Sequence, residues 1–165
     1  MNSSKELVAY LARTLAAELP RLRDVADDAR TAAPNRPEGV GWSQREELGH
    51  LVDSAVNNHA RIVRAALERS YEGPTYDQDG WIAAHRYREM PWSEIVDVWH
   101  AHNRILVPLI AALPDAKLAT PCRVGSSSPV TLGFLIDDYV LHMQHHLDQV
   151  LRRGIVTKYP RDAAT

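Results

Sequence analysis

The sequence predicts an all-α fold: an irregular up-down four-helix bundle with one extra short helix. Two observations support this prediction. Hydrophobic residues recur at spacings of three and four residues along four long segments, whereas no segment shows the sustained alternation of a strand. The chain has 165 residues, 45% hydrophobic and 24% charged, which is the composition of an ordinary globular protein. We therefore expect a single domain over residues 1–165.

Helix-capping residues mark where three of the long segments begin. Ser3 is followed by Glu6 and Ser43 by Glu46, and a serine with a glutamate three residues later is the capping-box pattern. Thr131 is in the same position before the last segment. The expected helices lie at residues 4–32, 43–69, 78–89, 92–113 and 132–153. Pro20 is expected to kink or briefly interrupt the first of these, and Pro108 to kink the fourth.

Residues 70–77 and 115–129 are expected to be loops, because both are rich in turn-forming residues. The only cysteine, Cys122, falls in the second loop, which excludes an internal disulfide and a cysteine-based zinc ribbon. A net charge of −2 and a pI near 6.4 argue against a nucleic-acid partner. No signal peptide or membrane span is evident, so we expect a cytoplasmic protein that does not bind membranes.

The last predicted helix carries a cluster of three histidines. His142 and His146 are four residues apart, so they lie about 40° apart on one helical face and one ion can bind both rings. His145 points about 60° to the other side of His142 and is not expected to share that ion. Pairs with this spacing are also common on ordinary helix surfaces, so a metal site needs a third ligand from elsewhere.

The second predicted helix has a polar side that offers candidates. Ser54, Asn57 and Arg61 each lie within about 40° of His50, opposite the apolar stripe. Such a row either faces solvent or lines a polar pocket. His59 lies on the apolar stripe instead and is expected to be a buried, hydrogen-bonded histidine.

Two stretches resemble the DinB-like superfamily. One is residues 42–61, in which His50 is followed by Asp53-Ser54, Asn57 and Arg61. The other is residues 142–149, His-Met-Gln-His-His-Leu-Asp-Gln. The family shows an early-helix histidine and a late H-x2-H-H segment in this order. The resemblance covers the length and helical order of the chain and implies the four-helix bundle of that family.

The resemblance makes His50, His142 and His146 the ligands of a divalent transition metal, Zn, Ni or Fe, with a position left open. Because His50 lies opposite its own apolar stripe, we expect the ion in a solvent-open cleft at one end of the bundle. Asp138 and Gln149 are candidate hydrogen-bond partners of the ligand rings, although a solvated Asp138 is equally plausible.

Four further residues are weaker candidates, and no catalytic residue is assigned. Asp53 and Asn57 follow His50 by about one and two turns and are pocket candidates. Trp81 and His85 on the short helix either form a wall of the cleft or, for Trp81, pack in the core.

The resemblance leaves three functions open. The first is an S-transferase that uses a low-molecular-weight thiol such as bacillithiol or mycothiol, in which case Cys122 is not catalytic. The second is a metal-dependent hydrolase with Asp53 or His145 as proton carrier. The third is a non-enzymatic, metal-stabilised stress or binding protein. A small-molecule substrate is expected for the first two, and a homodimer is expected because bundles of this family commonly pair.

Overall fold

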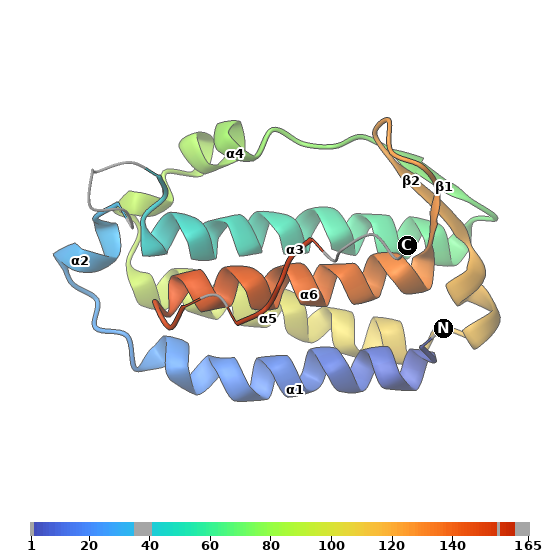
Figure 1. Cartoon of the computed structure of the whole chain (residues 1–165), viewed down its shortest axis with the longest axis horizontal. Helices are drawn as coiled ribbons and strands as arrows, with labels where there is room; N and C mark the ends of the chain where they lie inside the picture. Colours follow the sequence, from blue (N-terminus) through green and yellow to red (C-terminus); the bar gives the residue numbers. More distant parts are fainter. Residues whose placement is uncertain (1, 35–40, 155, 161–165) are drawn as a thin grey trace.

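Four long helices form the body of the protein in the structure, a computed structural model that describes residues 2–34, 41–154 and 156–160 (Figure 1). The predicted all-α four-helix bundle is confirmed. The long helices are α1 (Ser4–Arg23), α3 (Gln44–Leu67), α5 (Trp92–Ala111) and α6 (Leu132–Val150).

The helices are arranged so that α1 and α3 each pack against both α5 and α6. In Figure 1, α3 and α5 run in the same direction, and α1 and α6 run in the opposite direction. Since α3 and α5 are parallel, the segment between them has to return along the whole length of the bundle. Figure 1 shows this segment passing over α3 on the outside of the bundle, which makes the topology irregular.

Local sequence determines where the long helices begin. The Ser43 hydroxyl accepts a hydrogen bond from the Glu46 backbone N–H, and the Glu46 carboxylate accepts one from the Ser43 N–H at 2.8 Å. Ser3 and Glu6 form the same reciprocal pair. Thr131 Oγ1 accepts from the backbone N–H three residues later. These caps satisfy donors that an isolated helix end leaves unpaired, and all three were predicted.

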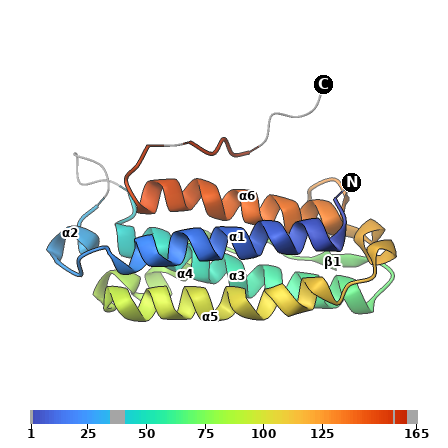
Figure 2. The same ribbon diagram turned by 90° about the horizontal axis from the view of Figure 1, so that it is seen from below.

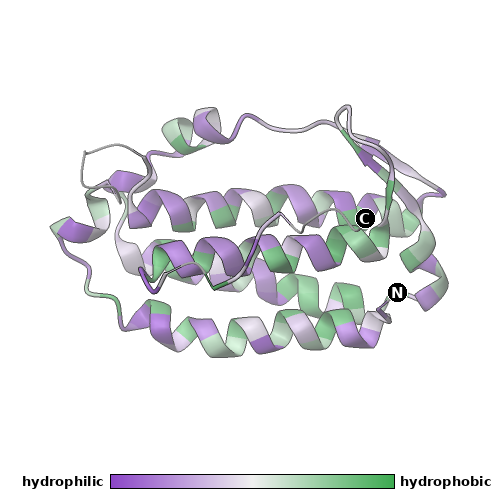
Figure 3. Ribbon diagram, in the orientation of Figure 1, coloured by the Kyte–Doolittle hydropathy of each residue, from purple (hydrophilic) through white to green (hydrophobic). Residues whose placement is uncertain are grey.

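The inward faces of the long helices form one apolar core. Hydrophobic and hydrophilic residues alternate along each helix (Figure 3), as expected for helices with one buried face. The largest side chain that is fully buried is that of Trp99 on α5. The other large, fully buried side chains include Leu7, Leu11, Leu22, Leu48, Leu51, Ile62, Ile95, Leu106, Ile110 and Leu132.

A small three-stranded sheet lies at one end of the bundle, where we had predicted only loops. Strand β2 (Pro121–Val124) pairs in parallel with β1 (Tyr71–Gly73) and antiparallel with β3 (Val130–Thr131). The loop predictions for residues 70–77 and 115–129 were therefore wrong over these strands. Strands this short cannot display the alternating pattern by which sequence analysis recognises a strand.

Cys122 lies in β2 and is buried, not placed in a loop as predicted. Its burial raises the pKa of the thiol, so it is poorly suited to act as a nucleophile.

The shorter helices also differ from the prediction. The helix expected over residues 78–89 consists of α4 (Gln78–His85) and the 3₁₀ helix η1 (Tyr87–Glu89), because Arg86 adopts a left-handed conformation with φ of 55°. The segment expected to be helical over residues 4–32 divides after Arg23 into α1 and α2 (Ala29–Ala32), whereas Pro20 lies inside α1. The 3₁₀ helix η2 (Asp115–Ala119) lies in the second predicted loop. None of the helices in the described residues has the length and apolar character needed to cross a bilayer.

The outer face of α3 is covered at its N-terminal half. The ring of Tyr87 on η1 lies directly over Gly49, and a Cβ atom at position 49 would overlap this ring. Asp53, one turn further along α3, is also buried and accepts a hydrogen bond from the Tyr87 hydroxyl. This half of α3 is therefore enclosed on the bundle side and on the outer side.

We expect Gly49→Ala to destabilise the fold by about 1–3 kcal/mol, because the added methyl group forces the Tyr87 ring to move. Gly133→Ala is the matched control, since a Cβ there comes no closer than 3.4 Å to Leu118. Urea unfolding of both variants measures the free energies. Equal stabilities of the two variants would contradict the tight packing of η1 on α3.

Candidate metal centre

Three histidines from two antiparallel helices converge between α3 and α6. The Nε2 atoms of His50 and His142 are 3.2 Å apart. The ring of His146 lies 4.6 Å from that of His50 and 4.5 Å from that of His142, between centroids. One nitrogen from each ring lies within 4.8 Å of the others. The structure thus brings together the three histidines that the sequence singled out.

His50 is buried, with only 1% of its surface exposed, and this corrects the expectation of an open cleft around it. The side of α3 opposite the apolar stripe is covered by other parts of the chain. The Trp42 ring lies 4.9 Å from the His50 ring, and the Trp42 indole N–H donates to Asp79 of α4. His142 and His146 are only partly buried, so the approach to the three rings is on the α6 side.

The buried imidazoles are held in their neutral form. Burial, with a smaller contribution from the His146 ring, lowers the pKa of His50 to about 3. Burial and the neighbouring rings lower the pKa of His142 to about 2. Both rings therefore keep a lone pair at neutral pH, which is the form that ligates metals.

The geometry and chemistry of the three rings fit a divalent transition metal. Two nitrogens bound tetrahedrally to one ion are about 3.3 Å apart, close to the 3.2 Å between the Nε2 atoms of His50 and His142. The other nitrogen of His50, Nδ1, is buried and has no hydrogen-bond partner among the described residues, so the fit rests on the Nε2 side of the ring. A set of neutral imidazoles suits Zn, Ni or Fe, so this group could hold one such ion.

Glu47 orients one of the three rings, and sequence reasoning missed it. Its carboxylate lies 2.9 Å from Nδ1 of His146, which directs the other nitrogen of that ring toward the histidine cluster. Glu47 is buried on α3, three residues before His50. Its position one turn from His50 on the same helix was the signal that could have identified it.

The two predicted partners of the ligand rings have other contacts. The amide nitrogen of Gln149 lies 3.0 Å from Nε2 of His145. Gln149 therefore contacts His145 and not His146, which corrects its expected role. Asp138 accepts a hydrogen bond from the Tyr159 hydroxyl at 3.2 Å. The other nitrogen of His145 contacts the backbone oxygen of Thr157 at 2.8 Å, so both ring nitrogens of His145 are engaged away from the cluster.

Asp53 lies on the other side of α3, between that helix and α4. Besides Tyr87, it contacts His85, with 3.1 Å between the Asp53 carboxylate and Nδ1 of His85. Burial raises the pKa of Asp53 despite these two neighbours. Asn57 uses its amide to donate to the backbone oxygen of Asp53. Neither Asp53 nor Asn57 lines the pocket described next, and Asn58 occupies the position that we had predicted for Asn57.

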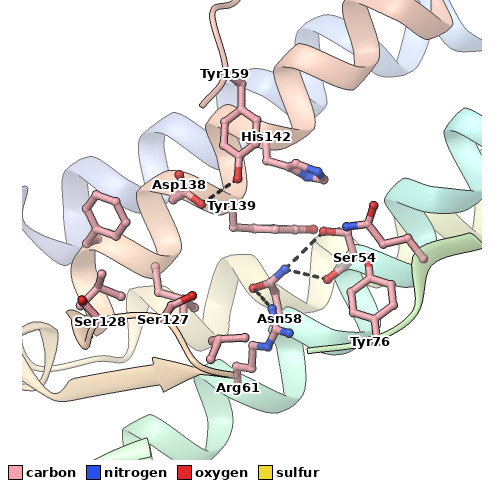
Figure 4. A pocket seen from close by; sticks show the side chains of 15 residues that line it. Ser54, Asn58, Arg61, Tyr76, Ser127, Ser128, Asp138, Tyr139, His142 and Tyr159 are labelled. Carbon is pink, nitrogen blue, oxygen red and sulfur yellow. Dashed lines mark hydrogen bonds between the residues drawn. The ribbon is translucent and has the colours of Figure 1, made fainter. Parts of the chain in front are cut away.

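A pocket of about 340 Å³ adjoins the histidine cluster (Figure 4). It is bounded by α3, α6, the β2–β3 turn and the C-terminal segment, and His142 forms part of its wall. Trp81 and His85, predicted as possible cleft walls, are absent from its described lining, and Trp81 instead packs on Tyr76 and His85. The polar lining residues include Ser54, Asn58, Arg61, Tyr76, Asp138 and Tyr159.

The other expectation for this region, a buried and hydrogen-bonded His59, is met only in part. His59 is partly buried, and its ring packs edge-on against that of His102 with 5.6 Å between centroids. This pair lies between α3 and α5, apart from the histidine cluster.

The C-terminal segment, residues 156–160, packs along α6 of the same chain (Figure 2). The carboxylate of Asp148 accepts hydrogen bonds from the backbone N–H groups of Val156 and Thr157, at 3.0 and 2.7 Å. This anchoring brings the Tyr159 ring to 5.1 Å from the His142 ring. Tyr159 is therefore part of the pocket wall beside the histidine cluster.

The fold and the three converging histidines place this protein among the four-helix bundles that carry a candidate metal site. The chain belongs to the DinB superfamily, because the sequence model of that family matches residues 10–150. The recognition of this family from residues 42–61 and 142–149 is confirmed.

Similar proteins include two that carry the name "putative metal-dependent hydrolase". One, from Oceanobacillus iheyensis, is 24% identical over 110 residues, and the other, from Bacillus mycoides, is 30% identical over 112 residues. The matches cover 67% and 64% of this chain and only 63% and 61% of those proteins, less than two thirds of their length.

A solved structure has the same fold. YfiT from Bacillus subtilis, described as "a probable metal-dependent hydrolase with an unusual four-helix bundle topology", superposes with a TM-score of 0.80. The match covers 93% of this chain and 89% of YfiT at 21% identity. At this identity the likeness concerns the fold, including the irregular helix order.

Asp148→Asn is expected to release the C-terminal segment. Burial alone would raise the pKa of Asp148, but hydrogen bonds from Thr157, Arg153 and Val156 outweigh it and lower the pKa below the ordinary value of 3.8. The anchoring is therefore complete above that pH and is lost as the pH falls below it. Limited proteolysis at neutral pH should cleave the variant near residues 154–160 faster than the parent. Unchanged cleavage would show that Asp148 does not hold the segment.

Proposed function

We propose that the protein is a metal-dependent enzyme, in which His50, His142 and His146 hold one divalent transition-metal ion next to a small-molecule pocket. We further propose that its reaction is the transfer of a low-molecular-weight thiol, such as bacillithiol or mycothiol, to an electrophilic substrate. One observation carries the proposal: three imidazoles, two of them held neutral by burial, converge where a polar pocket of about 340 Å³ begins.

The chain's own residues prepare this site. Glu47 fixes the His146 ring through its Nδ1, and burial keeps His50 and His142 unprotonated. When bound, the metal would lower the pKa of a coordinated thiol and hold it as the more nucleophilic thiolate. Tyr159 stays protonated on the pocket wall, because burial and the nearby Asp138 carboxylate raise its pKa to about 12. It is therefore a hydrogen-bond donor there.

Thiol transfer is favoured over hydrolysis because the candidate bases near the site already have other partners. A hydrolase needs a group that accepts a proton from water. Glu47 is engaged by His146, and both nitrogens of His145 have partners in the C-terminal segment and α6. Asp53 lies on the α4 side of α3, and Asp138 in the pocket lining already accepts a hydrogen bond from the Tyr159 hydroxyl. A thiol, with an ordinary pKa of about 8.5, would ionise on a metal more readily than water and could release its proton to solvent.

A metal-dependent hydrolase is the second candidate, and the names of the similar proteins from Oceanobacillus iheyensis and Bacillus mycoides favour it. In that case Asp138 is the carboxylate that could accept the proton, because it lines the pocket one helical turn from His142. The identity of the metal (Zn, Ni or Fe) remains a prediction, and so does the homodimer.

His146→Ala should lose the bound metal and the activity together, because two histidines remain in place of three. Elemental analysis of the purified protein measures the metal. The rate of conjugation of bacillithiol, mycothiol and simpler thiols to monochlorobimane, above a protein-free blank, measures the activity. His100→Ala, on α5 and outside the site, is the control and should behave like the parent.

The same experiment separates the alternatives. Turnover of ester or amide substrates without added thiol would replace the transferase by the hydrolase. Metal that raises the melting temperature without turnover in either assay would leave a metal-stabilised binding protein. Parent protein that binds no divalent metal would refute the proposal as a whole.

Glu47→Gln should weaken metal binding by about 10- to 100-fold without abolishing it, because the amide orients His146 less strongly than the carboxylate does. Competition with a chromogenic chelator measures the affinity. Glu94→Gln, an exposed position on α5, is the matched control. If both variants bind metal as tightly as the parent, the contact between Glu47 and His146 is not part of the site.

A further inference from the structure

Arg61 places a positive charge in the pocket at a distance from the histidines. It lies on α3, eleven residues after His50, which corresponds to a rise of about 16 Å along the helix. Its side chain is partly buried and lines the same pocket as His142. Figure 4 shows Arg61 and His142 on opposite sides of the pocket. The pocket therefore has two chemically different ends.

The charge of Arg61 is not matched by a carboxylate among the described residues. Its guanidinium donates to the Asn58 side-chain oxygen at 3.4 Å and to the Pro74 backbone oxygen at 3.3 Å, both long bonds to neutral acceptors. A guanidinium has five N–H donors, so donors remain available.

Two other arginines, the partly buried Arg45 and Arg153, which is more exposed, have acidic partners. Arg45 contacts Asp27 at 2.8 Å, and Arg153 contacts both Glu18 and Asp148 at 2.9 and 2.8 Å. In these cases the ion pair compensates for the partial loss of hydration of the guanidinium. Arg61 has no such partner among the described residues, so its charge is free to pair with an anionic group that enters the pocket.

Neutral hydrogen-bonding groups surround the Arg61 end of the pocket. Asn58 is held by its bonds to Ser54, and Tyr76 lines the pocket with its hydroxyl protonated, because burial raises its pKa to about 12. Ser127 and Ser128 of the β2–β3 turn lie on the same side in Figure 4. Asp138 is the carboxylate in the described lining, and it lies one helical turn from His142. Its negative charge is thus nearer the other end.

We propose that Arg61, with Asn58 and Tyr76, forms an anion subsite that binds a carboxylate or phosphate group of the substrate. The substrate is then an elongated molecule with its reactive group at the histidines and an anionic group at Arg61. The inference rests on the proposed function only in taking this pocket as the substrate pocket. A planar guanidinium suits both anions, because each offers two oxygens to the parallel N–H groups.

Calorimetric titration of the full-length protein with succinate and, separately, with inorganic phosphate tests the subsite. We expect Arg61→Gln to lower the affinity for the preferred anion by about tenfold or more, because a charge-assisted hydrogen bond is lost. Arg61→Lys should retain part of the binding, since it keeps the charge but not the fork. Arg64→Gln, on the exposed side of the same helix, is the control and should bind like the parent. Circular dichroism and melting curves verify that each variant is folded.

A second arm separates this inference from the proposed metal chemistry. His146→Ala should still bind the anion, because it leaves Arg61 intact. If the His146→Ala protein has lost its anion affinity and Arg61→Gln has kept it, the anion binds at the histidine cluster and the subsite is refuted. Stronger binding of succinate would identify the anionic group of the substrate as a carboxylate. Stronger binding of phosphate would identify it as a phosphate ester. Equal affinities of the parent and Arg61→Gln for both anions would also overturn the proposal.

Discussion

The packing of α3 against the antiparallel α6 is the contact on which the candidate site depends. His50 meets His142 and His146 in only one register of the two helices, since a shift by one turn displaces them by about 5.4 Å. Gln44 helps to fix that register, because its buried amide donates to the backbone oxygen of Val150 at 2.6 Å. The contact between Glu47 and His146 lies between this hydrogen bond and the histidine cluster. The histidines are thus positioned by rigid helices and not by loops.

The enclosure of α3 on two sides explains the electrostatics of the site. A helix of a four-helix bundle normally keeps one face in water, but here Trp42, α4 and η1 cover the outer face near His50. Polar groups on that half of the helix are therefore buried. Most of them have partners, yet Nδ1 of His50 and one carboxylate oxygen of Asp53 have none in the described part of the chain. Unpaired buried groups are costly to stability, and they concentrate at functional sites.

Sequence alone could predict what local interactions determine. The capping boxes at Ser3 and Ser43 depend on residues three apart, and the spacing of His142 and His146 depends on a single helical turn. His50 was identified only through the family resemblance, because nothing local relates residue 50 to residue 142. The burial of His50 was missed, because the Trp42 ring that covers it is held by Asp79 of α4, nearly thirty residues further along the chain. The contact of Glu47 with His146, the sheet and the pocket likewise depend on segments that are distant in the sequence.

The family match therefore covers the histidine cluster completely and the pocket only in part. The three histidines and Glu47 lie on α3 and α6, within the residues 10–150 that the family match covers. Tyr159 lies outside that range, and the β2–β3 turn and the segment before α4 add further parts of the wall. Different chemistry at these three segments would leave the histidine cluster unchanged while altering what fits beside it. The family match thus covers the three histidines, Glu47 and Arg61 alike, whereas the part of the pocket wall that Tyr159 forms must be argued from this chain itself.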